Sequence, residues 1–191
     1  AKLADAIRQL GADTVVLTEY KAGPAGEELQ SLLQQHGFGH FFAPTHMPAY
    51  KLGCAVASRH PIQITQPLSR PQSEPWRVVV FMHHGFEVYG LYVPATAPQI
   101  RTFWEWVLEL APNLLNRPCI LIGDFNTGVN RVDETTYRFA SHDQFLALQA
   151  HGFVDMWRHQ NPDARDDTWY SSAGNGFRLD HAFASPAAAQ A

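Results

Sequence analysis

Cysteine and long apolar runs are both scarce in this sequence. Two cysteines among 191 residues exclude a disulfide-stapled miniprotein and a zinc site built on cysteine pairs. The apolar runs, such as the one that ends at Ile122, fall short of the roughly 18 residues that a membrane helix requires. We therefore expect no membrane-spanning or membrane-targeting segment. Because Cys54 and Cys119 lie inside apolar runs, we expect two reduced, buried thiols in a cytoplasmic protein.

Several catalytic motifs are absent as well. The sequence contains no glycine-rich phosphate loop, no Cys-x-x-Cys pair and no Gly-x-Ser-x-Gly elbow. This removes P-loop nucleotide hydrolysis and serine-hydrolase chemistry from consideration. Histidine is plentiful, but His46, His83, His84 and His142 lack the spacing of metal ligands, so we interpret them as ordinary surface or loop side chains.

Positive charge is not in excess. Fourteen Lys and Arg residues stand against 18 Asp and Glu residues, which gives a formal net charge of -4. The chain therefore has no general attraction for phosphate backbones, and any contact with nucleic acid must be local. A hydrophobic content of 46%, with 12 Phe and five Trp, is enough to bury a sizeable core, so we interpret residues 1–191 as one domain.

Apolar spacing predicts interleaved helices and strands. The sequence is expected to begin inside a helix that carries Leu3, Ile7 and Leu10 and ends at Gly11, and further helices are expected over residues 27–35, 101–116 and 141–152. Strands are expected over residues 14–17, 53–58, 77–82, 86–93, 119–122, 168–170 and 177–185. Two of these strands, residues 77–82 and 86–93, are predicted to form a hairpin. Such interleaving predicts α/β layers around one core.

Three carboxylates follow the ends of expected strands. Glu19 and Asp124 each follow an apolar run after one intervening residue, and Asp180 follows Phe177-Arg178-Leu179. A carboxylate in such a place is costly to desolvate unless a cation or hydrogen-bond donors meet it. Each residue alone is compatible with a helix cap or a solvated strand end, but the three together suggest one shared cation.

Polar residues near two of these strand ends suit hydrolysis. Asp124 and Asn126 are two residues apart, so in extended geometry they point the same way, while Phe125 points to the apolar side. The carboxylate can orient a water or take its proton, and the amide can donate to a developing negative oxygen. Tyr92, also at a strand end, can donate to a phosphate oxygen without carrying charge; an amphipathic rim residue is the alternative interpretation.

Four sequence blocks carry a resemblance to a known family. Residues 17–20 (Leu-Thr-Glu-Tyr), 92–94 (Tyr-Val-Pro), 122–126 (Ile-Gly-Asp-Phe-Asn) and 176–180 (Gly-Phe-Arg-Leu-Asp) occur in order along essentially the whole chain. In this the sequence resembles the endonuclease/exonuclease/phosphatase superfamily, nearest to its exonuclease III-like branch. The resemblance implies a four-layered α/β sandwich, in which two facing mixed β-sheets are flanked by helices and the active site lies at one end of the sheets.

The resemblance also implies roles for single residues. Glu19 would be the principal ligand of Mg²⁺, with Mn²⁺ as an alternative ion, and Tyr92 would contact the phosphate. Asp124 and Asn126 would position and activate the attacking water. Asp180 matches the acid that buttresses a catalytic His from a Ser-Asp-His block. The sequence has neither that block nor the family's first-strand Asn, so we expect a domain that is truncated at both ends.

Substrate identity is less constrained by the sequence. Trp169, Phe177 and Leu179 match positions that line the pocket for a flipped-out deoxyribose in abasic-site endonucleases of the family, and core packing is the alternative interpretation. Arg178 is a candidate phosphate contact or a packing cation. Two departures from a DNA-repair enzyme are Ala95, where relatives usually have Asn or Gln, and a short loop after the Gly-Asp-Phe-Asn motif.

The leading hypothesis is a Mg²⁺-dependent phosphodiesterase, most simply a DNA nuclease with a part in DNA repair. A second hypothesis keeps the chemistry but changes the substrate to a small or lipid phosphoester. A third hypothesis is an inactive or incomplete binding module. No obligate protein partner is evident from the sequence.

Overall fold

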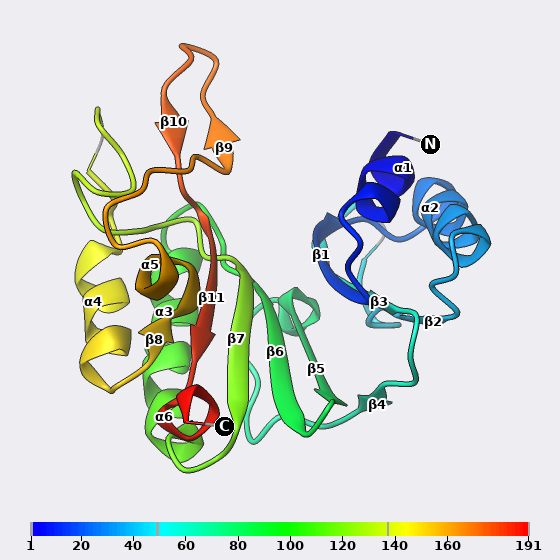
Figure 1. Ribbon diagram of the computed structural model, residues 1–191, viewed down its shortest axis with the longest axis horizontal. Helices are drawn as coiled ribbons and strands as arrows, with labels where there is room; N and C mark the ends of the chain where they lie inside the picture. The colour runs from blue at the N-terminus through cyan, green and yellow to red at the C-terminus, as the bar shows by residue number, and fades with distance from the viewer. Residues whose placement is uncertain (1, 49, 137, 191) are drawn as a thin grey trace.

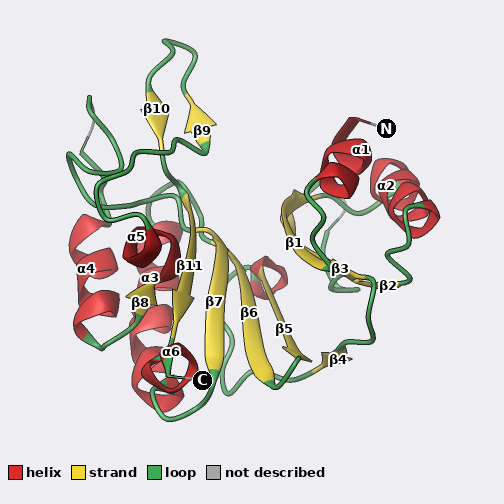
Figure 2. Cartoon of the chain, in the orientation of Figure 1, coloured by secondary structure: helices red, strands yellow, loops and turns green. Residues whose placement is uncertain are grey.

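A computed structural model describes residues 2–48, 50–136 and 138–190 (Figures 1 and 2). The α-helices are α1 (Lys2–Gln9), α2 (Pro24–Gln35), α3 (Gln99–Leu110), α4 (His142–Ala150), α5 (Met156–Gln160) and α6 (Pro186–Ala189), and the 3₁₀ helices are η1 (Pro75–Arg77) and η2 (Ala111–Leu114). The strands are β1 (Thr14–Tyr20), β2 (His40–Phe42), β3 (Gly53–Ser58), β4 (Gln63–Ile64), β5 (Val78–His83), β6 (Phe86–Tyr92), β7 (Cys119–Asp124), β8 (Val154–Asp155), β9 (Trp169–Tyr170), β10 (Gly176–Phe177) and β11 (Asp180–Ala184).

The strands form two main sheets and one small hairpin. The larger sheet has the order β4-β5-β6-β7-β11-β8, in which β6 and β7 are parallel and the other neighbours are antiparallel. The smaller sheet has the order β1-β3-β2 and is antiparallel. Strands β9 and β10 pair with each other and project beyond the larger sheet (Figure 1), and Phe177 of β10 also forms an isolated bridge with Glu134.

Helices cover the outer face of each main sheet. In Figure 2, α1 and α2 lie outside the smaller sheet, and α3, α4 and α5 lie outside the larger one. Three apolar clusters fill the spaces between these layers: one between α1, α2 and the smaller sheet, one between the two sheets, and one between the larger sheet and α3 and α4. This four-layered arrangement confirms the fold class predicted from the sequence.

Alternation along the strands assigns side chains to these layers. In β1, Val15 and Leu17 pack toward the helices, while Val16 joins the cluster between the sheets. In β7, Leu121 packs toward the helices and Ile122 toward the other sheet. Side chains on the inner faces of both sheets therefore point into the same interlayer space.

Several expected elements are confirmed, including the hairpin of β5 and β6. The hairpin turns at His84 and Gly85, which both have positive φ angles of 48° and 85°, as its two-residue loop requires. The expected strand over residues 177–185 is interrupted, because β10 ends at Phe177 and β11 begins at Asp180. At this interruption the amides of Leu179 and Asp180 both donate to Thr168 Oγ1, at 3.0 and 3.2 Å.

The structure also bears on the expectations for membrane segments and thiols. In the part of the chain that the structure describes, no helix is long and apolar enough to cross a bilayer. Cys54 and Cys119 are fully buried and free, as expected. Burial raises the pKa of the Cys119 thiol to about 11, so this thiol stays protonated at neutral pH.

Candidate functional site

Three polar residues form a row across the larger sheet. Tyr92 in β6 is the register partner of Asp124 in β7, and Asp124 is the register partner of Asp180 in β11. Residues paired in register point to the same face of a sheet. Segments that are far apart in the sequence thus bring two carboxylates and a phenol to one end of the sheet.

Glu19 reaches this row from the opposite sheet. It lies in a bulge of β1, where the register with β3 shifts between Leu17 and Tyr20, and its φ angle is 56°. A bulge redirects a side chain that regular pleating would send elsewhere. The Tyr92 hydroxyl donates to Glu19 Oε1 at 3.3 Å, so this hydrogen bond crosses between the two sheets.

Asn126 is fixed directly against Asp124. Its backbone N–H donates to Asp124 Oδ1 at 2.8 Å, and its Nδ2 donates to Asp124 Oδ2 at 3.1 Å and to the Val93 carbonyl at 2.7 Å. Asn126 has a left-handed conformation with φ 49°. Because both amide protons are engaged, Asn126 in this arrangement orients the Asp124 carboxylate, and it has no free proton for a developing negative oxygen.

The electrostatics of the row favour a proton acceptor at Asp124. Burial raises the pKa of Asp124 to about 7, and the nearby carboxylates of Asp180 and Glu19 add to the increase. The hydrogen bond from Asn126 acts in the opposite direction. A carboxylate with a pKa near neutrality is suited to take a proton from water and release it again. Burial also raises the pKa of Tyr92, which stays a neutral donor.

A cation is fixed behind Tyr92. The Arg77 guanidinium lies 4.3 Å from the centre of the Tyr92 ring, and Arg77 Nη1 donates to the Tyr92 carbonyl at 3.4 Å. Glu74 holds Arg77 through a 2.6 Å contact and is itself held by Lys51 at 2.8 Å. These contacts restrain the Tyr92 ring, whose hydroxyl faces Glu19.

The donor atoms present are all oxygens. Glu19 and Asp180 are exposed carboxylates, and Asp124 adds a third carboxylate to the same end of the sheets. No group of three or more His, Cys, Asp or Glu side chains among the described residues forms a ready-made metal site. Mg²⁺ commonly binds through one or two carboxylates and keeps its remaining waters. The donor set therefore fits a hydrated hard cation rather than a dehydrated ion in an all-protein cage.

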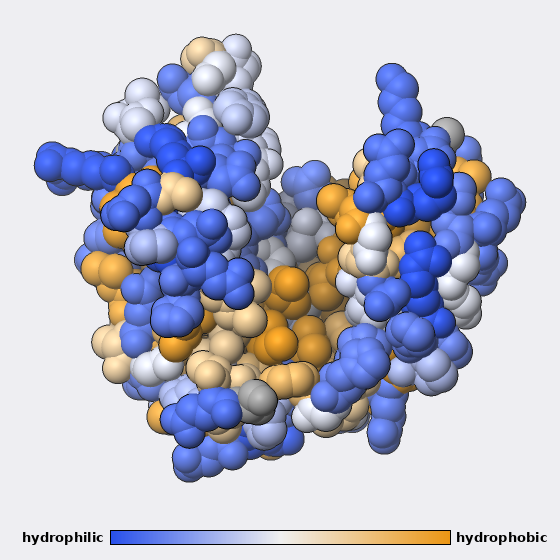
Figure 3. Space-filling view, viewed as in Figure 1, coloured by the Kyte–Doolittle hydropathy of each residue, from blue (hydrophilic) through white to orange (hydrophobic). Residues whose placement is uncertain are grey.

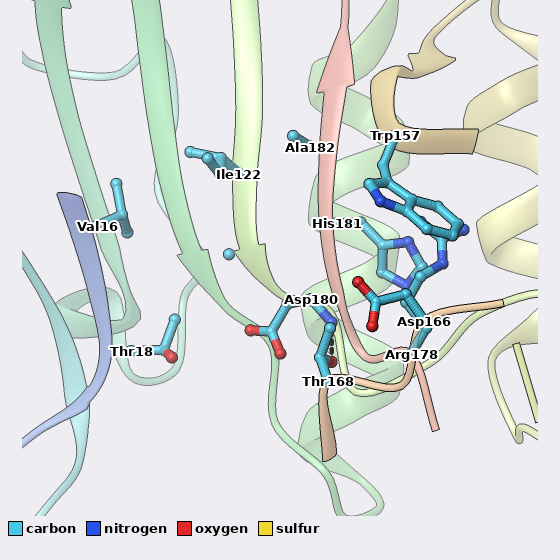
Figure 4. Close-up of a pocket in the computed structure, with 11 residues that line it drawn as sticks. Val16, Thr18, Ile122, Trp157, Asp166, Thr168, Arg178, Asp180, His181 and Ala182 are labelled. Atoms are coloured by element: carbon cyan, nitrogen blue, oxygen red, sulfur yellow. Dashed lines mark hydrogen bonds between the residues drawn. The ribbon is translucent and has the colours of Figure 1, made fainter. Parts of the chain in front are cut away.

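A cleft between the sheets leads to this row. It has a volume of about 330 Å³, and Val16, Ile122 and Ala182 are among its apolar lining residues. Figure 3 shows the hollow between the two halves of the molecule, with hydrophobic residues on its floor and hydrophilic residues around it. In Figure 4, the Asp180 carboxylate points into the space facing β1, whereas the His181 ring lies on the other side of β11.

The aromatic residues predicted to bind substrate lie beside the row, on and next to the β9–β10 hairpin. Trp169 is 50% exposed, and its ring lies 5.6 Å from that of Phe177. Phe177 is buried and also packs against Phe139. Leu179 is partly exposed, and its carbonyl accepts a hydrogen bond from the Phe125 amide at 2.9 Å. Trp169 and Leu179 thus offer accessible apolar surface, with Phe177 as support.

Arg178, a candidate phosphate contact or packing cation, lies in a buried network of ion pairs. The residue is 3% exposed, and its guanidinium contacts Asp133 at 2.8 Å and Asp155 at 2.7 Å. Arg158 also contacts Asp133, at 3.1 Å. Because these buried ion pairs occupy the donors of Arg178, they favour the packing interpretation over a phosphate contact, although Arg178 is among the residues that line the cleft.

Sequence reasoning missed the residues that hold the site in place. Asp155 accepts hydrogen bonds from Arg178 and His181, and although burial opposes it, these bonds hold the pKa of Asp155 below its usual range. Asp155 follows the apolar pair Phe153 and Val154, the same signal that singled out Glu19. That signal could have found Asp155, whereas Asp133 follows no comparable strand.

Solved structures share this fold. An AP endonuclease from Archaeoglobus fulgidus superposes with a TM-score of 0.80 at 17% identity, covering 96% of this chain and 80% of that one. A 3'-5' exonuclease, NExo, from Neisseria meningitidis superposes with a TM-score of 0.81 at 23% identity, covering 100% of this chain and 84% of that one. The 3' phosphatase NExo from Neisseria, bound to product DNA hairpin, superposes with a TM-score of 0.76 at 22% identity, covering 100% of this chain and 84% of that one.

Sequence comparison gives the family directly. No curated protein matches the chain. The model of the Endonuclease/Exonuclease/phosphatase family, in contrast, matches residues 1–191. The match extends over all four sequence blocks and over the row of polar residues that the fold assembles from them. The chain therefore belongs to the Endonuclease/Exonuclease/phosphatase family.

Proposed function

We propose that this protein is a Mg²⁺-dependent phosphodiester hydrolase that acts on DNA. One observation supports this most strongly: Glu19 from one sheet meets Tyr92, Asp124 and Asp180 from the other at the open end of an apolar cleft. Such a set combines a proton acceptor, a neutral hydrogen-bond donor and carboxylates suited to a hard cation.

The cation would be held mainly by Glu19. Its carboxylate is exposed and lies next to the Tyr92 hydroxyl, and the exposed Asp180 faces the same space. When bound, a divalent ion neutralises charge on the phosphate during attack by water. Mg²⁺ fits the oxygen donors best, and Mn²⁺ would be accepted by the same set.

The remaining residues would orient and activate water. Asp124, with its pKa near 7, accepts the proton of the attacking water, and Asn126 fixes the direction of its lone pairs through two hydrogen bonds. The Tyr92 hydroxyl, which donates its one proton to Glu19 in the structure, would exchange that partner for a phosphate oxygen when substrate binds. Asp180 stands beside Asp124 and helps to raise its pKa, which keeps the acceptor reversible near neutrality.

A DNA substrate is supported by the neighbours and by the hairpin. The three similar structures are those of an AP endonuclease, an exonuclease and a phosphatase bound to DNA. In this chain, Trp169 and Leu179 offer apolar surface beside the row, where a sugar that lacks its base would fit. We also propose a cytoplasmic location, which the two unpaired, buried thiols support.

A second candidate is removal of a terminal 3'-phosphate from DNA. It is favoured by the structural likeness to a 3' phosphatase bound to product DNA hairpin. The proton acceptor and the cation site would serve a monoester as well as a diester, so the two activities differ in the substrate that the cleft admits.

Hydrolysis assays test the proposal. We expect turnover of duplex DNA with an abasic site or a 3'-phosphate in Mg²⁺, no turnover in EDTA, and recovery when Mg²⁺ is restored. Small diesters and a phosphoinositide in mixed vesicles distinguish the alternative substrates. Glu19→Ala and Asp124→Ala should each lower kcat/KM by at least about a hundredfold. The exposed acids Glu28 and Asp163 provide matched controls, because their Ala variants should keep full activity.

Three outcomes would contradict it. Turnover that survives EDTA excludes the metal, and full activity in either site variant excludes the assigned roles. Absence of turnover on every substrate, combined with retained binding of DNA, would favour the binding-module hypothesis instead.

A further inference from the structure

A buried histidine lies directly behind the candidate site. His181 follows Asp180 in β11, and since neighbours in a strand point to opposite faces, its ring faces the helices while Asp180 faces the cleft (Figure 4). His181 is 4% exposed, in contrast to the exposed Asp180. Its ring therefore cannot contact a substrate in the cleft, and any influence on the site must pass through other residues.

The two ring nitrogens of His181 have defined partners. Nε2 lies 2.9 Å from the Thr127 carbonyl oxygen, and Nδ1 lies 3.4 Å from Asp155 Oδ2. A carbonyl can only accept, so Nε2 carries a proton and donates it. Asp155 is in turn fixed by Arg178 through contacts of 2.7 and 3.2 Å. The ring thus connects a rigid ion-pair network to the chain at Thr127.

Aromatic neighbours hold the ring in this orientation. Phe145 lies 4.6 Å from it, Phe125 5.7 Å at a right angle, and Phe183 6.0 Å in a stacked arrangement. These rings exclude water from the surroundings of Nε2. Without competition from water, the hydrogen bond to Thr127 is stronger, and its loss would leave a buried carbonyl unpaired.

The residue held by His181 follows the left-handed turn of the site. Asn126 has a left-handed φ of 49°, which Asn adopts more readily than most residues but which is only one of the conformations open to it, so contacts around it help to select it. On one side, Asn126 Nδ2 donates to the Val93 carbonyl. On the other, Thr127 is fully buried, and its carbonyl is held by His181, whereas its hydroxyl has no hydrogen-bond partner among the described atoms.

We propose that His181 is a positioning residue, which locks the turn at Asn126 and Thr127 through the Thr127 carbonyl and so keeps Asn126 bonded to Asp124. Its effect on catalysis rests on the proposed function, because Asp124 and Asn126 act there on the attacking water. Its effect on the turn is independent of any activity and can be measured on the folded protein alone.

Two substitutions that differ by one methylene separate the two contacts of His181. In His181→Gln, the amide nitrogen reaches about as far as Nε2 and can donate to Thr127. In His181→Asn, the shorter amide reaches about as far as Nδ1 and can contact only Asp155. Thr127→Val removes a hydroxyl that makes no bond among the described atoms and leaves the carbonyl in place, and Phe183→Leu perturbs packing in the same strand.

Amide exchange measured by NMR reports directly on the turn. In His181→Asn, we expect the Asn126 amide, which donates to Asp124, to exchange about tenfold faster than in the wild type. In His181→Gln and Thr127→Val it should exchange within about threefold of the wild-type rate. Equal exchange in the Asn and Gln variants would overturn the inference, as would equal acceleration in Phe183→Leu.

Kinetics supply the second measurement. On whichever DNA substrate the wild type hydrolyses, His181→Asn should lower kcat about tenfold or more with KM within about twofold, and His181→Gln should recover most of kcat. A loss that falls on KM, or that Gln does not recover, contradicts a positioning role. If the wild type shows no hydrolysis, the proposed function fails, while the exchange rates still decide whether His181 holds the turn.

Discussion

Asp124 is the residue whose surroundings most alter its chemistry. Its side chain accepts two hydrogen bonds from Asn126 and stands in register between Tyr92 and Asp180. Burial and the neighbouring carboxylates raise its pKa to about 7, against a usual value of 3.8. The ionised form that the proposed reaction needs is therefore the form that the fold tolerates least.

Because the fold disfavours the ionised form of Asp124, a substitution that neutralises this side chain should raise the free energy of unfolding at high pH. A raised folded-state pKa means that the native state binds the proton more tightly, so the free energy of unfolding falls as pH rises from about 4 to about 7. Asp124→Asn removes the charge and keeps an acceptor for the Asn126 backbone N–H, but it loses the hydrogen bond from Asn126 Nδ2 at every pH. We therefore expect its free energy of unfolding, relative to that of the wild type, to rise by about 2 kcal/mol between pH 4 and pH 8, in urea unfolding.

A matched control is Asp163→Asn, an exposed aspartate outside the site. It should change the free energy of unfolding little at either pH, since its carboxylate remains in water. A stability gain in Asp124→Asn that is the same at pH 4 and pH 8 would show that charge is not its cause.

At the scale of elements, the close approach of β6 and β7 sets the position of the row. Gly123 has a φ of 141°, and a Cβ at this position would collide with the Leu91 carbonyl in β6. Only glycine permits both the backbone conformation and the contact. The strand pair that carries Tyr92 and Asp124 thus depends on a residue without a side chain between Ile122 and Asp124.

Gly123→Ala should therefore be costly. We expect the free energy of unfolding to fall by at least about 2 kcal/mol, because strain in φ adds to a clash with rigid backbone. Gly174→Ala is the control, since Gly174 also has a positive φ, of 81°, but no atom lies within 4 Å of its added Cβ. Urea unfolding of the two variants measures the difference. Equal losses would mean that the contact with β6 contributes nothing.

The sequence predicted the long elements of the fold because their patterns are strong. The apolar runs of β3, β5 and β7 and the stripe of Phe103, Val107 and Leu110 in α3 allow few other structures. Two-residue strands such as β4 and β8 are too short to show an alternation of apolar and polar residues, so the sequence does not predict them. Ser141 precedes α4 at the N-cap position, but its hydroxyl makes no cap hydrogen bond.

The candidate site was predictable only in part for a related reason. Glu19, Asp124 and Asp180 stand out because charged residues follow apolar runs. The partners of Arg178 could not be deduced, because Asp133 lies in a loop 45 residues away and is brought to it only by the tertiary fold. Local sequence patterns report the faces of strands, whereas buried ion pairs depend on how those strands are connected.

At the scale of the whole molecule, the two sheets share one apolar interior. Cys54 and Val56 of β3 pack against Val79 and Phe81 of β5, and the Tyr92 hydroxyl bonds to Glu19 across the same interface. We infer that neither sheet keeps its inner face covered without the other.

The two sheets should therefore unfold together. In urea, tryptophan fluorescence, which reports on Trp104 and Trp106 in α3 and on Trp76 beside the smaller sheet, and far-UV circular dichroism should give one coincident transition. Val56→Ala should lower the free energy of unfolding by about 2 kcal/mol and move both curves equally to lower urea concentration. Separate transitions, or a shift in only one signal, would show that the sheets are independent units.

The left-handed backbone at Glu19 has a consequence for how this chain can change. Glycine adopts that conformation without strain, so replacing Glu19 by glycine would relieve about 1 kcal/mol of local cost while deleting the proposed metal ligand. Selection for thermal endurance alone would favour that replacement, and selection for the proposed turnover would reject it. At Asn126 the two demands agree, because Asn tolerates the left-handed conformation and a glycine there would lose the hydrogen bonds to Val93 and Asp124.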